Sequence, residues 1–159
     1  MSSNESGDSA GDEATISGFR FQVPRGWRQV EPTPAQQGFI DARFEIPESG
    51  EDVKLTLSTI AGGLPANIGR WIEQVRLPEG AVPVSETLDV DGIPVTLVDL
   101  SGEFQEMGQP PRPGWRMLGA AFDGEPRDFY IKLTGPESAV SELRDEFRTF
   151  VTAARRTQR

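Results

Sequence analysis

Residues 62–75 read Gly62-Gly63-Leu64-Pro65-Ala66-Asn67-Ile68-Gly69-Arg70-Trp71-Ile72-Glu73-Gln74-Val75, and here the sequence changes from a strand pattern to a helix pattern. Before this stretch, residues 53–60 alternate apolar and polar side chains, the period of a strand with one buried face. The paired glycines and the proline interrupt that strand. Apolar residues then recur at the spacing of one helical face: Ile68, Trp71, Ile72 and Val75. We therefore expect a helix over about 67–76 that packs one side on a sheet.

Polar residues of the same helix make a candidate binding site. Asn67 is expected to be the N-cap, because its side-chain oxygen can accept an amide hydrogen of the first turn. Backbone amides at a helix N-terminus can hold an anion. The candidate binding residues of this helix are Asn67, Arg70, Trp71 and Gln74. The alternative is a purely structural helix anchored by Trp71. The glycine pattern matches neither a phosphate-binding P-loop nor a dinucleotide fingerprint, since the Lys-Ser/Thr pair and the third glycine are missing.

Composition excludes several kinds of chemistry. The chain has 159 residues, 36% of them hydrophobic, which suits one domain with a real core. Its net charge of −9 and isoelectric point of about 4.6 argue against nucleic acid or an anionic membrane surface as partner. It contains no cysteine and no histidine, which excludes disulfides, Cys or His nucleophile–base pairs and Cys or His metal ligands. We predict no cofactor and no metal site.

The ends of the chain differ in composition from its middle. Residues 1–14 are rich in Ser, Gly and acidic residues and predict a disordered tail or linker. We expect a single folded domain over 15–155 and a basic tail over 156–159. No apolar run is long enough to span a membrane, and no signal-peptide core is present. Two placements stay open: a cytoplasmic protein, or an exported or lipid-anchored precursor whose leader has been removed.

Strand patterns recur on both sides of the central helix. The ranges with strand character are 16–23, 27–30, 38–46, 53–60, 83–90, 93–102, 115–122 and 129–134. Asp91-Gly92 lies between two apolar runs, which favours a hairpin with a type I′ turn. Residues 103–114 contain three prolines and predict a long irregular loop. A second helix is expected after Pro136, with an apolar stripe of Val140, Leu143, Phe147, Phe150, Val151 and Ala154.

These elements predict an α+β fold, a mostly antiparallel sheet of about eight strands with two main helices packed on it. The opening Phe21-Gln22-Val23-Pro24-Arg25-Gly26-Trp27 resembles the Mog1/PsbP-like superfamily, as does the order of elements over residues 16–155. The stretch from Gly62 to Trp71 resembles small bacterial proteins of that fold, often with a lipoprotein-type leader. The resemblance implies an α/β/α sandwich. Members of the superfamily are binding or assembly factors, one branch acting with the oxygen-evolving photosystem and another with a Ran-type GTPase.

Other residues could extend the site or support a different function. Trp115 and Arg116 would join the helix residues if the loop over 103–114 folds across them. Carboxylates are the remaining acid–base groups, and a pair drawn from Asp41, Glu45, Asp99 and Glu103 would support hydrolase chemistry. Asp89 begins a run like a calcium loop, but the twelfth residue is Leu100 where such a loop needs Glu.

The function expected from these observations is a non-enzymatic binding or assembly domain. Its expected partner is a protein and not nucleic acid, and the chain itself is expected to be a monomer or a weak homodimer. Two alternatives stay open: a small hydrolase that uses a carboxylate pair, and a structural domain associated with the cell envelope.

Overall fold

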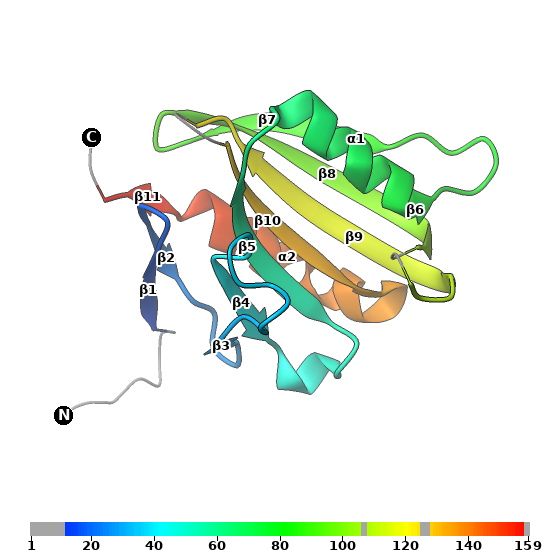
Figure 1. Ribbon diagram of the computed structural model, residues 1–159, viewed down its shortest axis with the longest axis horizontal. Coiled ribbons are helices and arrows are strands. Elements are labelled where there is room, and N and C mark those ends of the chain that lie inside the picture. The colour runs from blue at the N-terminus through cyan, green and yellow to red at the C-terminus, as the bar shows by residue number, and fades with distance from the viewer. Residues whose placement is uncertain (1–11, 106–107, 125–127, 158–159) are drawn as a thin grey trace.

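A mostly antiparallel eight-stranded sheet forms the centre of the molecule, with one helix on each face (Figure 1). The computed structural model describes residues 12–105, 108–124 and 128–157. The strand order is β3-β4-β5-β10-β9-β8-β6, and β7 also pairs with β8. The strands are β3 (Arg28–Val30), β4 (Ala42–Glu45), β5 (Lys54–Ile60), β6 (Val75–Arg76), β7 (Val84–Val90), β8 (Ile93–Phe104), β9 (Arg112–Phe122) and β10 (Asp128–Pro136).

The two helices, α1 (Leu64–Gln74) and α2 (Glu137–Thr152), divide the core into two clusters, and we name the faces of the sheet after them. On the α2 face, alternate residues of β5, β9 and β10 pack with the apolar stripe predicted for the second helix. On the α1 face, a smaller cluster surrounds Trp71 and includes Trp115, Met117 and Tyr130. The predicted α+β architecture is confirmed.

Trp71 holds α1 on the sheet by lying directly over Gly119 of β9. A Cβ added at Gly119 would lie 2.7 Å from Trp71 Cε3 and 2.8 Å from Cη2, closer than atoms can approach. The Trp71 ring also meets Tyr130 edge-on, with ring centroids 5.6 Å apart. Trp71 is only 7% exposed, so this contact is core packing. Trp71 therefore anchors the helix on the sheet, as the structural alternative predicted.

The boundaries of α1 differ from the prediction. The helix begins at Leu64, three residues earlier, and its N-cap is Gly63 with φ of 90° and no side-chain cap. Pro65 does not break the chain here but sits in the first turn, where a missing N–H costs no helical bond. Asn67 is therefore not the N-cap. The helix ends at Gln74 because Val75, the first residue of β6, is extended and pairs with Phe104 of β8.

The predicted strand over 16–23 is a hairpin. β1 (Glu13–Ile16) and β2 (Phe19–Gln22) join through Ser17 and Gly18, which both have positive φ. With β11 (Arg155–Arg156) they form a small separate sheet. Thus Glu13 and Ala14, which the prediction placed in the tail, already belong to a strand, and so does Arg156. Residues 1–11 and 158–159 lie outside the described part of the chain.

The hairpin predicted at Asp91-Gly92 is confirmed. Both residues have positive φ, 52° and 86°, as a type I′ turn requires, and Val90 pairs with Ile93. The predicted loop over 103–114 is too long, because β8 continues to Phe104 and β9 begins at Arg112. The predicted strand over 38–46 is too long as well. The 3-10 turn η1 (Pro47–Ser49) follows β4.

Among the described residues, no helix has both the length and the apolar character needed to cross a membrane.

Candidate functional site

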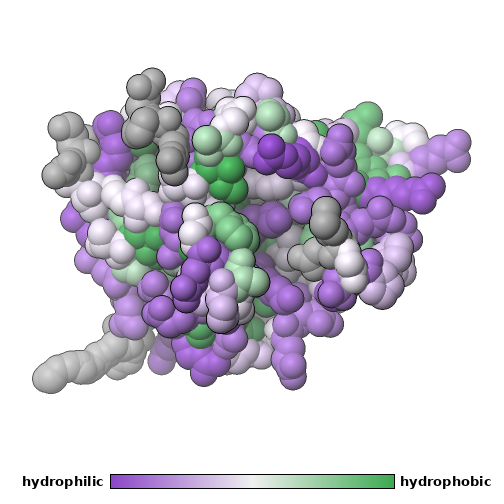
Figure 2. Space-filling model, in the orientation of Figure 1, coloured by the Kyte–Doolittle hydropathy of each residue, from purple (hydrophilic) through white to green (hydrophobic). Residues whose placement is uncertain are grey.

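A hollow of about 220 Å³ lies on the α1 face, between α1, β5, β10 and the segment before β4. We call it the α1 hollow. Its lining residues are Phe39, Ile40, Thr56, Ser58, Ile60, Asn67, Arg70, Trp71, Gln74, Tyr130 and Lys132. The structure thus brings together all four candidate binding residues of the predicted helix. Figure 2 shows this side of the molecule, where hydrophilic residues predominate and hydrophobic patches lie scattered between them.

Asn67 connects the helix to the sheet. It is 4% exposed, and its side-chain nitrogen donates to the hydroxyl of Tyr130 at 2.9 Å and to the carbonyl of Gly63 at 3.0 Å. The carbonyl of Ala61 is a third acceptor at 3.3 Å. The side-chain oxygen of Asn67 accepts from Arg70 Nη1 at 2.6 Å. One buried amide therefore sets the positions of both the Arg70 guanidinium and the Tyr130 hydroxyl.

The hydroxyl groups of two buried residues, Ser58 and Tyr130, have hydrogen-bonding capacity that the described residues do not use. Burial raises the pKa of Tyr130 above its ordinary value, while the hydrogen bond from Asn67 acts in the opposite direction. That hydroxyl accepts from Asn67, but its own hydrogen has no acceptor in the described part of the chain. Ser58 is 6% exposed, and its hydroxyl has no hydrogen-bond partner among the described residues.

The α1 hollow carries two cationic groups and no carboxylate in its lining. Arg70 is exposed at the rim and makes no ion pair with any described residue. Lys132 donates to the side-chain oxygen of Gln74 at 3.3 Å. Sheet register explains this grouping, because Ser58 lies opposite Tyr130 and Thr56 lies opposite Lys132. The hollow therefore offers hydrogen-bond donors and positive charge to a group that accepts.

Trp115 and Arg116 do not join this site. They are consecutive residues of β9, and consecutive strand residues point to opposite faces. Trp115 lies on the α1 face, 8% exposed, and stacks on Phe104 with ring centroids 5.5 Å apart. It lies outside the α1 hollow, and the guanidinium of Arg112 covers its ring at 4.9 Å.

Arg116 belongs to the α2 face. Its guanidinium donates to both carboxylate oxygens of Asp99, at 2.9 and 2.6 Å, and to the hydroxyl of Ser141 in α2 at 2.8 Å. These hydrogen bonds to Asp99 raise the pKa of Arg116. Arg116 is therefore a link between the sheet and α2, which corrects its predicted placement beside the central helix.

The four predicted acids do not form a catalytic pair. β4 and β8 lie four strand spacings apart, so Asp41 and Glu45 are about 19 Å from Asp99 and Glu103. Within each couple, four residues of extended chain span about 13 Å. Glycosidase carboxylates lie about 5–9.5 Å apart. In the described part of the chain, no group of three or more acidic residues could hold a metal ion either.

Three of these carboxylates have partners of their own. Asp41 accepts from the hydroxyls of Ser17 and Thr59, each at 2.6 Å. Asp99 is paired with Arg116. Glu45 accepts from Arg28 at 2.5 Å, and this hydrogen bond lowers the pKa of Glu45. The lowered pKa of Glu45 is the opposite of what a general acid needs at neutral pH.

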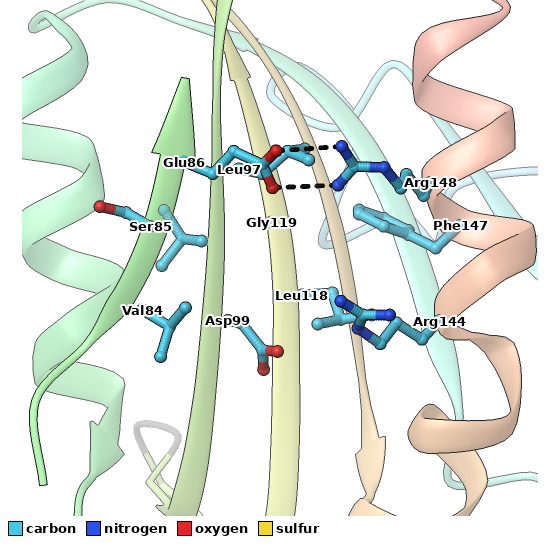
Figure 3. A pocket seen from close by; sticks show the side chains of 11 residues that line it. Val84, Ser85, Glu86, Leu97, Asp99, Leu118, Gly119, Arg144, Phe147 and Arg148 are labelled. Carbon is cyan, nitrogen blue, oxygen red and sulfur yellow. Dashed lines mark hydrogen bonds and ion pairs between the residues drawn. The ribbon is translucent and has the colours of Figure 1, made fainter. Parts of the chain in front are cut away.

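A smaller hollow of about 80 Å³ lies on the α2 face between β7 and α2 (Figure 3). Leu97, Leu118 and Phe147 form its apolar walls. Glu86 of β7 and Arg148 of α2 reach across it and form two hydrogen bonds of 3.0 Å each. This hollow is about a third the size of the α1 hollow, and an ion pair spans it.

Sequence reasoning missed Ser58, Tyr130 and Lys132 as residues of the α1 hollow. Their signal was present, since each lies at a polar or half-polar position that alternates with the buried leucines and isoleucine of β5 and β10. Knowing that these positions face α1 required the position of α1 itself.

Comparison with known proteins shows the fold. No family model matches the chain, and no curated protein matches it. Among solved structures, the chain is similar to cyanobacterial PsbP (CyanoP) from Synechocystis sp. PCC 6803, with 16% identity, a TM-score of 0.64 and 98% of each chain covered. It is also similar to LpqN of Mycobacterium tuberculosis, described as involved in cell envelope biogenesis. That match has 15% identity and a TM-score of 0.53, and covers 94% of this chain and 86% of LpqN. The predicted Mog1/PsbP-like fold is confirmed.

Proposed function

We propose that this chain is a non-enzymatic binding domain that docks a partner protein on its α1 face, with the α1 hollow at the centre of the contact. The observation that carries the proposal is the convergence of Asn67, Arg70, Trp71 and Gln74 on one hollow without a carboxylate in its lining. The buried side chain of Asn67 also accepts from Arg70, which holds this exposed arginine at the rim of the hollow.

The size of the hollow favours a protein partner over a free small molecule. Small-molecule pockets usually enclose about 300–1,000 Å³. The α1 hollow is smaller, at about 220 Å³, and suits one side chain or a chain end. Phe39 lines it while 52% exposed. Exposed aromatic and arginine side chains are the types enriched at protein interfaces.

The hydrolase alternative has no support from the geometry, because the four predicted acids are far apart and three of them already have partners. A role within an envelope assembly is a more specific form of the binding proposal. The fold that the chain shares with LpqN is compatible with it.

Affinity capture with matched variants tests the proposal. The wild-type chain is the bait, and Arg70→Glu is the test variant. Arg144→Glu is the control, since Arg144 is also an exposed helical arginine, 57% exposed, but on α2 at the other face. Circular dichroism should show both variants folded, because neither side chain is in the core. We expect a partner that binds wild type and Arg144→Glu but not Arg70→Glu.

Capture that is equal for the two variants, or lost only with Arg144→Glu, would contradict a contact centred on the α1 hollow. Phe39→Ser supplies a second test at another exposed lining residue, and it should weaken binding of the same partner without changing the circular dichroism spectrum.

A further inference from the structure

We propose that the α1 hollow binds a carboxylate, provided by an acidic side chain or by the terminal carboxylate of the docked chain. This inference rests on the proposed function and names the group that occupies its centre.

Arg70 is the first donor toward such a group. A guanidinium has five N–H donors in a planar fork that matches the two oxygens of a carboxylate. Asn67 accepts from Nη1 of Arg70, and no described residue pairs with the charge of this guanidinium. The bond to Asn67 also restricts the arginine side chain before a ligand arrives, which lowers the entropy lost on binding.

The two hydroxyl groups are the second and independent observation. Buried polar groups in folded proteins nearly always have a hydrogen-bond partner. Ser58 is 94% buried as a residue, but its hydroxyl oxygen is still accessible; the residue lines the hollow and has no partner among the described residues. Tyr130 accepts from Asn67 and so has its O–H hydrogen left to donate. Ser58 and Tyr130 form one cross-strand pair of neighbouring strands, and both line the hollow.

The surroundings favour a carboxylate over a phosphate. The donors are side chains on the flank of α1, and the helix N-terminus with its free amides takes no part in the lining. The backbone N–H of Asn67 already donates to the carbonyl of Gly63. The apolar side chains of Ile40, Ile60 and Trp71 lie beside the cationic groups, which suits a negative charge joined to a hydrocarbon stem.

Nuclear magnetic resonance titration of the full chain tests the inference with four probes. Three are short peptides of the same apolar sequence: one with an internal glutamate and an amidated end, one with glutamine and an amidated end, and one with glutamine and a free terminal carboxylate. The fourth probe is inorganic phosphate. We expect saturable amide shifts at Ser58, Tyr130, Lys132 and along α1 with the carboxylate peptides. The stronger of the two identifies the source of the carboxylate.

Variants give the residue-level test. Arg70→Gln and Ser58→Ala should each raise the Kd of the better peptide, Arg70→Gln by about tenfold, since hydrogen bonds to charged groups are the stronger ones. Arg144→Gln on the opposite face should leave the Kd unchanged. Equal binding of the neutral peptide, shifts with phosphate alone, or shifts confined to other parts of the chain would overturn the carboxylate assignment.

The failure of this inference differs from that of the proposed function. If no carboxylate peptide binds while Arg70→Glu still abolishes partner capture, the α1 face remains the docking surface and only the carboxylate assignment is wrong. If the Arg70 variant changes neither measurement, both proposals are wrong.

Discussion

Replacing Gly119 by alanine should destabilise the protein by forcing Trp71 away from the sheet. The added methyl group would overlap the six-membered ring of the indole, at 2.7 Å from Cε3 and 2.8 Å from Cη2. Trp71 has little room for a small shift, because Tyr130 meets its ring edge-on and the residue is 7% exposed, which leaves the α1 hollow that it lines as open space. The helix that carries the predicted site must therefore move or the indole must change rotamer.

The magnitude follows from two limits. Overpacking a core usually costs about 1–3 kcal/mol, and complete loss of a buried tryptophan costs about 3–5 kcal/mol. Partial displacement of Trp71 should cost as much as a severe overpacking but less than complete loss of the tryptophan. We therefore expect Gly119→Ala to lower the free energy of unfolding by about 2–3 kcal/mol. Gly69→Ala is the matched control, because nothing lies within 4 Å of its added Cβ and it sits inside α1. It should raise the stability by about 1 kcal/mol.

Urea unfolding, followed by circular dichroism, measures these changes, and Trp71→Leu completes a double-mutant cycle. Leucine lacks the ring atoms that the new methyl group would meet, so Gly119→Ala should cost at least about 1 kcal/mol less in that background. The reasoning is refuted if Gly119→Ala costs the same in both backgrounds, or if it stabilises the protein as Gly69→Ala should.

Two further predictions concern titration and ion pairs. Tyr130 is the only tyrosine of the chain, so ultraviolet absorbance of the phenolate reports it alone, and its midpoint should lie above 10.0 in the folded protein and return to that value in denaturant. Because folding raises the pKa of Tyr130, the protonated hydroxyl contributes stability that is present below pH 10.0 and is lost as the pH rises through the folded pKa. A midpoint at or below 10.0 in the folded state would contradict the burial of the hydroxyl. Asp99→Asn should lower the free energy of unfolding by about 1–2 kcal/mol, since it leaves the mostly buried Arg116 without its carboxylate. The exposed pair of Glu86 and Arg148 is the control, and Glu86→Gln should cost clearly less in the same urea experiment.

Much of the fold was predictable because local periodicity survives in the tertiary structure. The alternation in β5 and β10 and the apolar stripe of α2 predicted buried faces that the structure has. The Asp91-Gly92 turn was predictable for a local reason, since few residue pairs accept two consecutive positive φ angles. Chemistry based on histidine or cysteine was excluded by composition alone.

The Ser17-Gly18 turn shows where local signals were weaker. Its two residues also have positive φ, but serine there is not a strong turn signal, so the hairpin read as one strand. Trp115 and Arg116 show a different error. Strand alternation already implied that they point to opposite faces, and only the expectation of a long loop before them placed them together.

The composition of the α1 hollow depended on tertiary structure. The sequence by itself predicted a one-sided helix over about 67–76 with an asparagine, an arginine and a glutamine beside its apolar stripe. It did not determine which sheet residues lie beneath that helix, because strand order and register join residues far apart in the chain. The pairing of β5 with β10 places Ser58 beside Tyr130, and the absence of a side chain at Gly119 allows Trp71 to pack directly on β9. Only then does Asn67 change from a predicted helix cap into the buried amide that holds Arg70 and Tyr130 together.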